Sequence, residues 1–112
     1  MSVRAETALW ALQRVSAAVL GICVLVHLLT IVLAVQGGLS AAEILQRTRG
    51  STGWASFYLL FVLAVAIHAP IGLRTVLRET VGWRGGTLDA AAAALAVLLA
   101  AAGWRAVAGL FA

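Results

Sequence analysis

Three long apolar runs, separated by short polar stretches, account for most of the chain. They cover about residues 13–36, 54–79 and 87–109, and each is close to the roughly 20 residues that an α-helix needs to cross a bilayer. Glycines end the first run and precede the third, at Gln36-Gly37-Gly38 and Gly85-Gly86. The pattern therefore predicts an all-α membrane protein with three transmembrane helices, forming a single membrane-anchor domain over residues 1–112.

The polar stretch between the first two runs carries a helix-start signal. Ser40 and Glu43 have the spacing of a capping box, which predicts a short helix over about residues 41–47 at the membrane interface. A polar loop follows it up to Gly53. At the start of the third run, Thr87 is the residue expected to cap the helix.

Composition argues against a soluble enzyme. Hydrophobic residues make up 63% of the chain and charged residues only 11%, about half the usual share. The sequence contains no glycine-rich phosphate loop, no cysteine pair and no nucleophile triad. The single cysteine, Cys23, lies inside the first apolar run and is expected to be a small buried side chain.

The basic charge follows the flanks of the predicted helices. All eight basic residues are arginines, against four acidic residues. Five fall on one side of the membrane and three on the other: Arg4, Arg14, Arg74, Arg78 and Arg84 against Arg47, Arg49 and Arg105. The positive-inside rule then places the N-terminus in the cytoplasm. The membrane is expected to be a bacterial inner (cytoplasmic) membrane. Charge of this origin does not indicate nucleic acid as a partner.

Two histidines lie inside the apolar runs, His27 in the first and His68 in the second. An ionisable group within a membrane usually faces the bundle interior and marks a functional site. Ala64 and Gly72 lie one turn before and after His68 on the same helix face, which predicts space beside the imidazole for a flat group such as haem. The alternative is an imidazole that only hydrogen-bonds a serine or a carbonyl across the bundle.

The two histidines are expected at different depths. If Arg14 and Arg74 mark one membrane boundary, His27 lies roughly 20 Å from it and His68 roughly 9 Å, at 1.5 Å per helical residue. A difference of about 10 Å is too large for the two axial ligands of one iron. If both histidines are ligands, each serves a different haem, whose second ligand comes from another chain. With no carboxylate or cysteine nearby, a zinc site is not expected.

Two segments of the chain match motifs of a known family. The second run contains His68-Ala-Pro-Ile-Gly72-Leu-Arg74, and the first begins with Gln13-Arg14-Val15-Ser16-Ala17. The chain thereby resembles the cytochrome b membrane-anchor subunit of succinate dehydrogenase and fumarate reductase (respiratory complex II). That family shows His-x-x-x-Gly-x-Arg in its second helix and often His-Arg-x-Ser-Gly in its first. Three helices in 112 residues also fit, so the resemblance covers nearly the whole chain.

The resemblance implies roles for four residues. His68 corresponds to the axial ligand of the haem b near the iron–sulfur subunit. Arg14 corresponds to an arginine near the quinone site, and Ser16 lies in the same motif. His27 has the place of the ligand to the far haem in two-haem members, whose first helix serves the haem more distant from the cytoplasm.

Two positions depart from the family. Trp10 stands where ubiquinone-type members have a serine that contacts quinone, and Gln13 replaces the histidine of the motif. The quinone contacts of those residues therefore do not carry over. Guanidinium groups donate forked hydrogen bonds, which makes Arg14, Arg74 and Arg78 candidates for haem propionates or quinone carbonyls. The alternative for each is a flank residue of a membrane helix.

By this resemblance, the chain is half of a heterodimeric haem-binding bundle and a non-catalytic electron-transfer subunit of succinate:quinone oxidoreductase. With a second membrane-anchor subunit it would hold haem b, two copies being favoured. Electrons would pass from the flavoprotein and iron–sulfur subunits to a quinone. The alternatives are a haem-free structural anchor, a di-haem cytochrome b of another respiratory dehydrogenase, and a transporter subunit. The last would need charged residues along a central path, which the sequence lacks.

Overall fold

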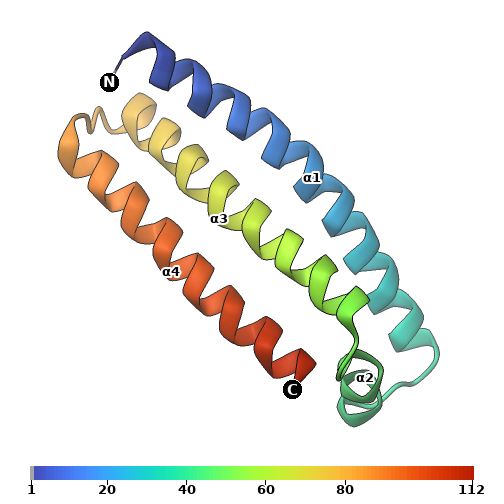
Figure 1. Cartoon of the computed structure of the whole chain (residues 1–112). Helices are drawn as coiled ribbons and strands as arrows, with labels where there is room; N and C mark the ends of the chain where they lie inside the picture. Colours follow the sequence, from blue (N-terminus) through green and yellow to red (C-terminus); the bar gives the residue numbers. More distant parts are fainter. Residues whose placement is uncertain (1) are drawn as a thin grey trace.

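The fold is a layer of three long helices, seen in a computed structural model that describes residues 2–112 (Figure 1). The helices α1 (Val3–Gln36), α3 (Thr52–Thr80) and α4 (Gly86–Phe111) are each long and apolar enough to cross a membrane, which confirms the predicted fold class. In Figure 1, α3 lies between α1 and α4. It packs against both, whereas contact between α1 and α4 is slight. The two outer helices are therefore held together mainly through α3.

Serine side chains set the starts of three helices. Ser2 accepts a hydrogen bond from the Ala5 N–H, so α1 begins well before the expected start near residue 13. Ser51 does the same for α3 by accepting from the Trp54 N–H. The short helix α2 (Ala41–Thr48) begins with the predicted capping box, in which Ser40 and the Glu43 side chain each bond the other's backbone N–H.

The prediction that Thr87 caps the third transmembrane helix is wrong. The N-cap of α4 is Gly85, at φ 91°, a left-handed conformation that glycine adopts without strain. Thr87 instead accepts a hydrogen bond from Trp83 Nε1 at 2.8 Å. The indole of Trp83 thus ties the α3–α4 turn to the first turn of α4.

At the opposite end, the chain after α2 is bonded to the last turn of α4. Carbonyl groups at a helix end lack partners within the helix, and leaving them unpaired is costly near hydrocarbon. Here three of them are paired: Leu110 O with Thr48 Oγ1 at 3.0 Å, Phe111 O with Gly50 N at 2.8 Å, and Ala112 O with Arg49 Nε at 2.7 Å. These bonds fix α2 beside the end of α4.

Small and buried residues bring the helices together in the middle of the layer. Gly103 of α4 lies so close to Val62 of α3 that a Cβ at this position would stand 2.7 Å from Val62 Cγ2. Cys23 of α1 is only 2% exposed, as expected for a small buried side chain. The helix α3 continues through Pro70 without interruption. Most large apolar side chains of α1 remain exposed, as they would be against lipid or another membrane chain.

Candidate functional site

The two ends of the layer carry different numbers of arginines. The N-terminus and the α3–α4 turn lie at one end, and α2 and the C-terminus lie at the other (Figure 1). The sequence-based grouping of the arginines into five and three therefore matches the arrangement of the helices.

His68 of α3 is hydrogen-bonded to α1. Its Nδ1 lies 3.5 Å from Ser16 Oγ, and Ser16 is only 5% exposed. The Ser16 hydroxyl donates to the Gln13 carbonyl at 3.1 Å, so it can accept from a hydrogen on Nδ1 of His68. In that tautomer, Nε2 of His68 keeps a free lone pair for another ligand.

The space beside His68 differs from the expected one. On the Gly72 side, the Gln13 side chain occupies part of this space, because its Nε2 stands 3.1 Å from where a Cβ of Gly72 would be. An open groove of about 630 Å³ instead runs from His68 over the outer side of α1, lined there by Ala17, Ala18, Leu20, Gly21, Ile22, Val24 and Leu25. We call it the His68 groove. A Cβ added at Gly21 would meet nothing within 4 Å, so the helix surface here is flat and accessible.

His27 of α1 lies among aromatic residues of α3. Its Nδ1 is 3.3 Å from the Tyr58 hydroxyl, and the Phe61 ring stands edge-on to it at 5.6 Å. Tyr58 is stacked on Trp54, with the ring centroids 5.9 Å apart. Like His68, His27 therefore has a hydroxyl beside its Nδ1.

Two apolar cavities meet at His27. One, of about 410 Å³, lies across α3 toward small residues of α4 that include Ala102, Gly103 and Ala106. The other, of about 330 Å³, extends toward α2 and is lined by His27, Thr30, Ile31, Leu33, Ala34, Leu39, Ile44, Arg47, Thr48, Trp54 and Tyr58. We call the second the α2 cavity.

The helix register sets the depth of each histidine. His68 contacts Ser16, which is eleven residues before His27 on α1, or about 16 Å at 1.5 Å per residue. This exceeds the expected difference of about 10 Å. The estimate erred because Arg14 and Arg74 do not mark the same level: Gln13 lies against Gly72, whereas Arg74 reaches the first turns of α1. The two imidazoles are thus even further apart in depth than the sequence predicts, and they cannot bind the same iron.

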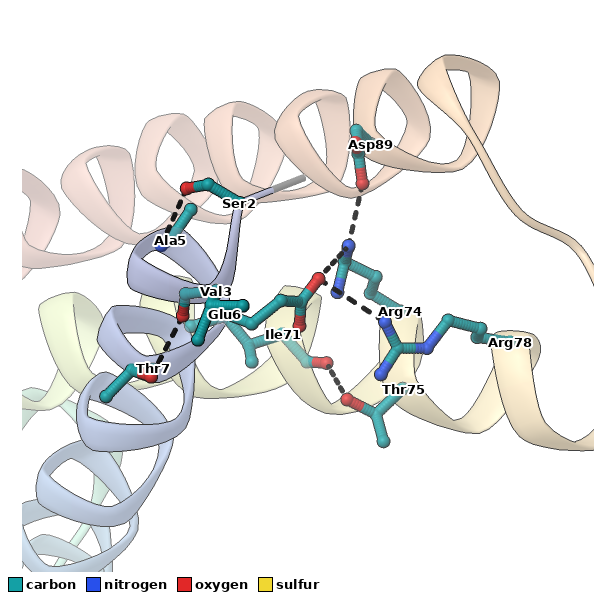
Figure 2. A network of polar contacts seen from close by, with 10 residues as sticks. All are labelled: Ser2, Val3, Ala5, Glu6, Thr7, Ile71, Arg74, Thr75, Arg78 and Asp89. Carbon is teal, nitrogen blue, oxygen red and sulfur yellow. Dashed lines mark hydrogen bonds and ion pairs between the residues drawn. The ribbon is translucent and has the colours of Figure 1, made fainter.

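Arg74 joins all three long helices at the N-terminal end of the layer. Figure 2 shows it between Asp89 of α4 and Glu6 of α1. Its Nε donates to Asp89 Oδ1 at 2.7 Å, and its Nη2 to Glu6 Oε1 at 3.1 Å. The Arg74 side chain is 10% exposed, against 37% for Glu6 and 41% for Asp89. Arg78 adds a longer contact to Glu6 at 3.4 Å. Two of the three arginines considered for a cofactor thus have carboxylate partners within the chain.

Replacing Arg74 by glutamine is expected to destabilise the helix layer, because Glu6 and Asp89 would lose the cation between them. Breaking a fully buried ion pair is strongly destabilising, but both carboxylates here are more than a third exposed, so the expected loss of stability is well below that of a fully buried pair. The midpoint of thermal unfolding of the detergent-solubilised complex measures it. The matched control is Arg4→Gln, the same charge change at the same end; equal shifts in both variants would contradict the assignment.

Arg14 and Ser16 do not lie together, although they share one sequence motif. Arg14 is exposed and its guanidinium lies 5.3 Å from the centroid of the Trp10 ring. On α1 it shares a face with Ala18 and Gly21, four and seven residues further on. Arg14 therefore stands at the N-terminal end of the His68 groove, whereas Ser16 is turned inward to His68.

Sequence reasoning missed four residues that the structure brings to these sites. Tyr58 and Arg47 lie near His27, and Glu6 and Asp89 lie near Arg74. For the acids a signal was available, because each falls in the first turn of an apolar helix on the side of Arg74. For Tyr58 and Arg47 the sequence carries no such signal, because the register of α1 against α3 and the position of α2 depend on packing.

The family model described as "Succinate dehydrogenase/Fumarate reductase transmembrane subunit" matches residues 1–108. No curated protein and no solved structure gives a significant match. The matched region includes α1, α3, most of α4 and both histidines. The chain therefore belongs to the family of succinate dehydrogenase/fumarate reductase transmembrane subunits and is a membrane-integral subunit of such a complex.

Proposed function

We propose that the chain is the membrane-anchor cytochrome b subunit of a succinate:quinone oxidoreductase. With a second anchor subunit it holds two haems b, and electrons pass from the flavoprotein and iron–sulfur subunits through haem to a quinone. The observation that supports this most is the pair of imidazoles at depths about 16 Å apart, each beside a hydroxyl and each lining an apolar groove or cavity.

The residues around each histidine fit a haem b. The haem supplies reversible one-electron chemistry at its iron, while the protein supplies a ligand, a low dielectric and a fixed position. Ser16 and Tyr58 can each accept a hydrogen bond from Nδ1, which holds the ring in place and would leave Nε2 to ligate a haem iron. Within residues 2–112, no three His, Cys, Asp or Glu side chains gather. Each imidazole is thus a single ligand, which suits an iron already held by a porphyrin.

Arg14 is the arginine that we propose to bind a cofactor at the His68 groove. Arg74 and Arg78 have Glu6 as a partner, and Arg74 also has Asp89. Arg14 is exposed at the end of the His68 groove, so its guanidinium is available to a haem propionate or a quinone carbonyl there. Arg74 and Arg78 then serve to hold the helices together.

The proposed orientation places the N-terminus in the cytoplasm of a bacterium, in its inner membrane. It is supported by the five arginines at the N-terminal end of the layer against three at the α2 end. His68 is the histidine nearer to the five-arginine end. Its haem is therefore the one closer to the soluble subunits, and the haem at His27 lies toward the far side.

A haem-free structural anchor is the second candidate, because the Ser16–His68 contact would also stabilise helix packing without any cofactor. A reduced-minus-oxidised spectrum of the purified complex, with haem counted per flavin, separates the two. We expect two haems b per flavin, reduced when succinate is added. A complex without haem absorbance supports the structural anchor, and haem without a co-purifying flavoprotein supports a different dehydrogenase.

A further inference from the structure

Arg47 places a positive charge at the cavity that contains His27. It lies in the last turn of α2 and lines the α2 cavity together with His27, Trp54 and Tyr58. It is the only permanently charged side chain among the residues that line this cavity. The remaining lining is mostly aliphatic or aromatic, so a ligand held here is apolar over most of its surface and acidic at one edge.

Arg47 also differs from its neighbours in having unused donors. Over residues 2–112, it has no hydrogen-bond, ion-pair or ring partner, whereas Arg49 donates to the Ala112 carbonyl. The two threonines of the cavity are also engaged, Thr30 with the His27 carbonyl and Thr48 with that of Leu110. The Arg47 guanidinium therefore offers the cavity a fork of N–H donors that no protein group uses.

We propose that Arg47 binds a propionate carboxylate of the haem at His27, so that the acidic edge of this haem faces α2. The inference rests on the proposed function. A haem is apolar over its ring and carries its charges on one edge, which matches the charge distribution of the α2 cavity. A carboxylate inside a membrane protein needs a partner, and a guanidinium can bind one through two parallel hydrogen bonds.

The position of Arg47 is suited to this role. The helix α2 is amphipathic and is fixed to the end of α4 by hydrogen bonds, so Arg47 is held at the end of the layer where water is accessible. Water and guanidinium together lower the cost of keeping the propionate ionised. A cation beside this edge also favours the reduced haem, since reduction adds a negative charge.

The test is the reduction potential of the His27 haem in the whole complex carrying Arg47→Gln. We expect the equilibrium constant for its reduction to fall by about tenfold, which is about 59 mV for one electron. Arg47→Lys, which keeps the charge, should recover most of the change. The matched control is Arg105→Gln, which removes an exposed arginine from the C-terminal part of α4 and should leave both haem potentials unchanged.

Each outcome either supports or overturns the assignment. A lowered potential confined to one haem, recovered by lysine and absent in the Arg105 variant, supports it. Unchanged potentials in Arg47→Gln, or equal shifts in both arginine variants, overturn it while leaving the two-haem function intact. If Arg47→Gln lowers the haem content, Arg47→Lys must restore it, or the residue only stabilises α2. A wild-type complex without haem would instead remove the proposed function itself.

Discussion

Replacing His68 by alanine is expected to lower the haem content of the purified complex from two haems per flavin to one. The substitution removes the only imidazole that this chain offers to the near haem, and a porphyrin held only by apolar contact and by its other ligand is easily lost. The α-band of the haem closer to the iron–sulfur subunit should vanish, while the band of the haem at His27 remains. Haem extraction and low-temperature optical spectra measure both effects.

The His68→Ala result needs a control for misfolding. Removing the imidazole leaves a void beside Ser16, and added imidazole can enter such a space and act as the missing ligand. We expect imidazole to restore the lost absorbance. Ser16→Ala keeps the ligand and removes only its hydrogen-bond partner, so it should retain haem and shift its potential. A His68→Ala complex that still holds both haems would refute the assignment.

Replacing His27 by alanine is expected to remove the other haem and to leave the His68 haem in place. The two imidazoles lie about 16 Å apart in depth, so the loss of one ligand does not open the site of the other. Redox titration should then show a single transition, at the potential of the His68 haem. Tyr58→Phe is the matched control, because it deletes only the hydroxyl beside Nδ1 of His27 and should preserve the haem.

The pair of variants also tests the number of sites. If His27→Ala and His68→Ala each abolish all haem while the complex stays assembled, a single haem depends on both residues and the two-site proposal is wrong. If His27→Ala leaves the haem content unchanged, the chain holds only the haem at His68. The distinction requires flavin as the internal standard, since a loss of whole complexes lowers both signals together.

The length of the apolar runs was sufficient to predict the three membrane helices, and the spacing of Ser40 and Glu43 was sufficient to predict the capping box of α2. The structure contains both the long helices and α2. The hydropathy pattern also showed that both histidines lie within the spanning segments, at unequal depth. These features depend on residues close in sequence, which is why they could be predicted.

Features that depend on contact between helices could not be predicted. Gly72 lacks a side chain, but whether its surface is open depends on which α1 residue lies opposite, and that residue is Gln13. Arg74 matches a family motif, yet it is engaged by Glu6 and Asp89 from two other helices. One local feature was missed as well: α1 starts at Val3, because Ser2 caps it, and the polar residues in its first turns concealed this start.

The vertical separation of the two imidazoles has an energetic consequence for turnover in a living cell. About 16 Å is roughly half of the ~30 Å hydrocarbon core, so an electron moving from one proposed iron to the other crosses part of the membrane's electric field. Carrying one charge across the whole membrane costs about 2.3 kcal/mol per 100 mV, which makes this step worth about 1 kcal/mol per 100 mV. The energised state of the membrane would then favour one direction of electron flow over the other.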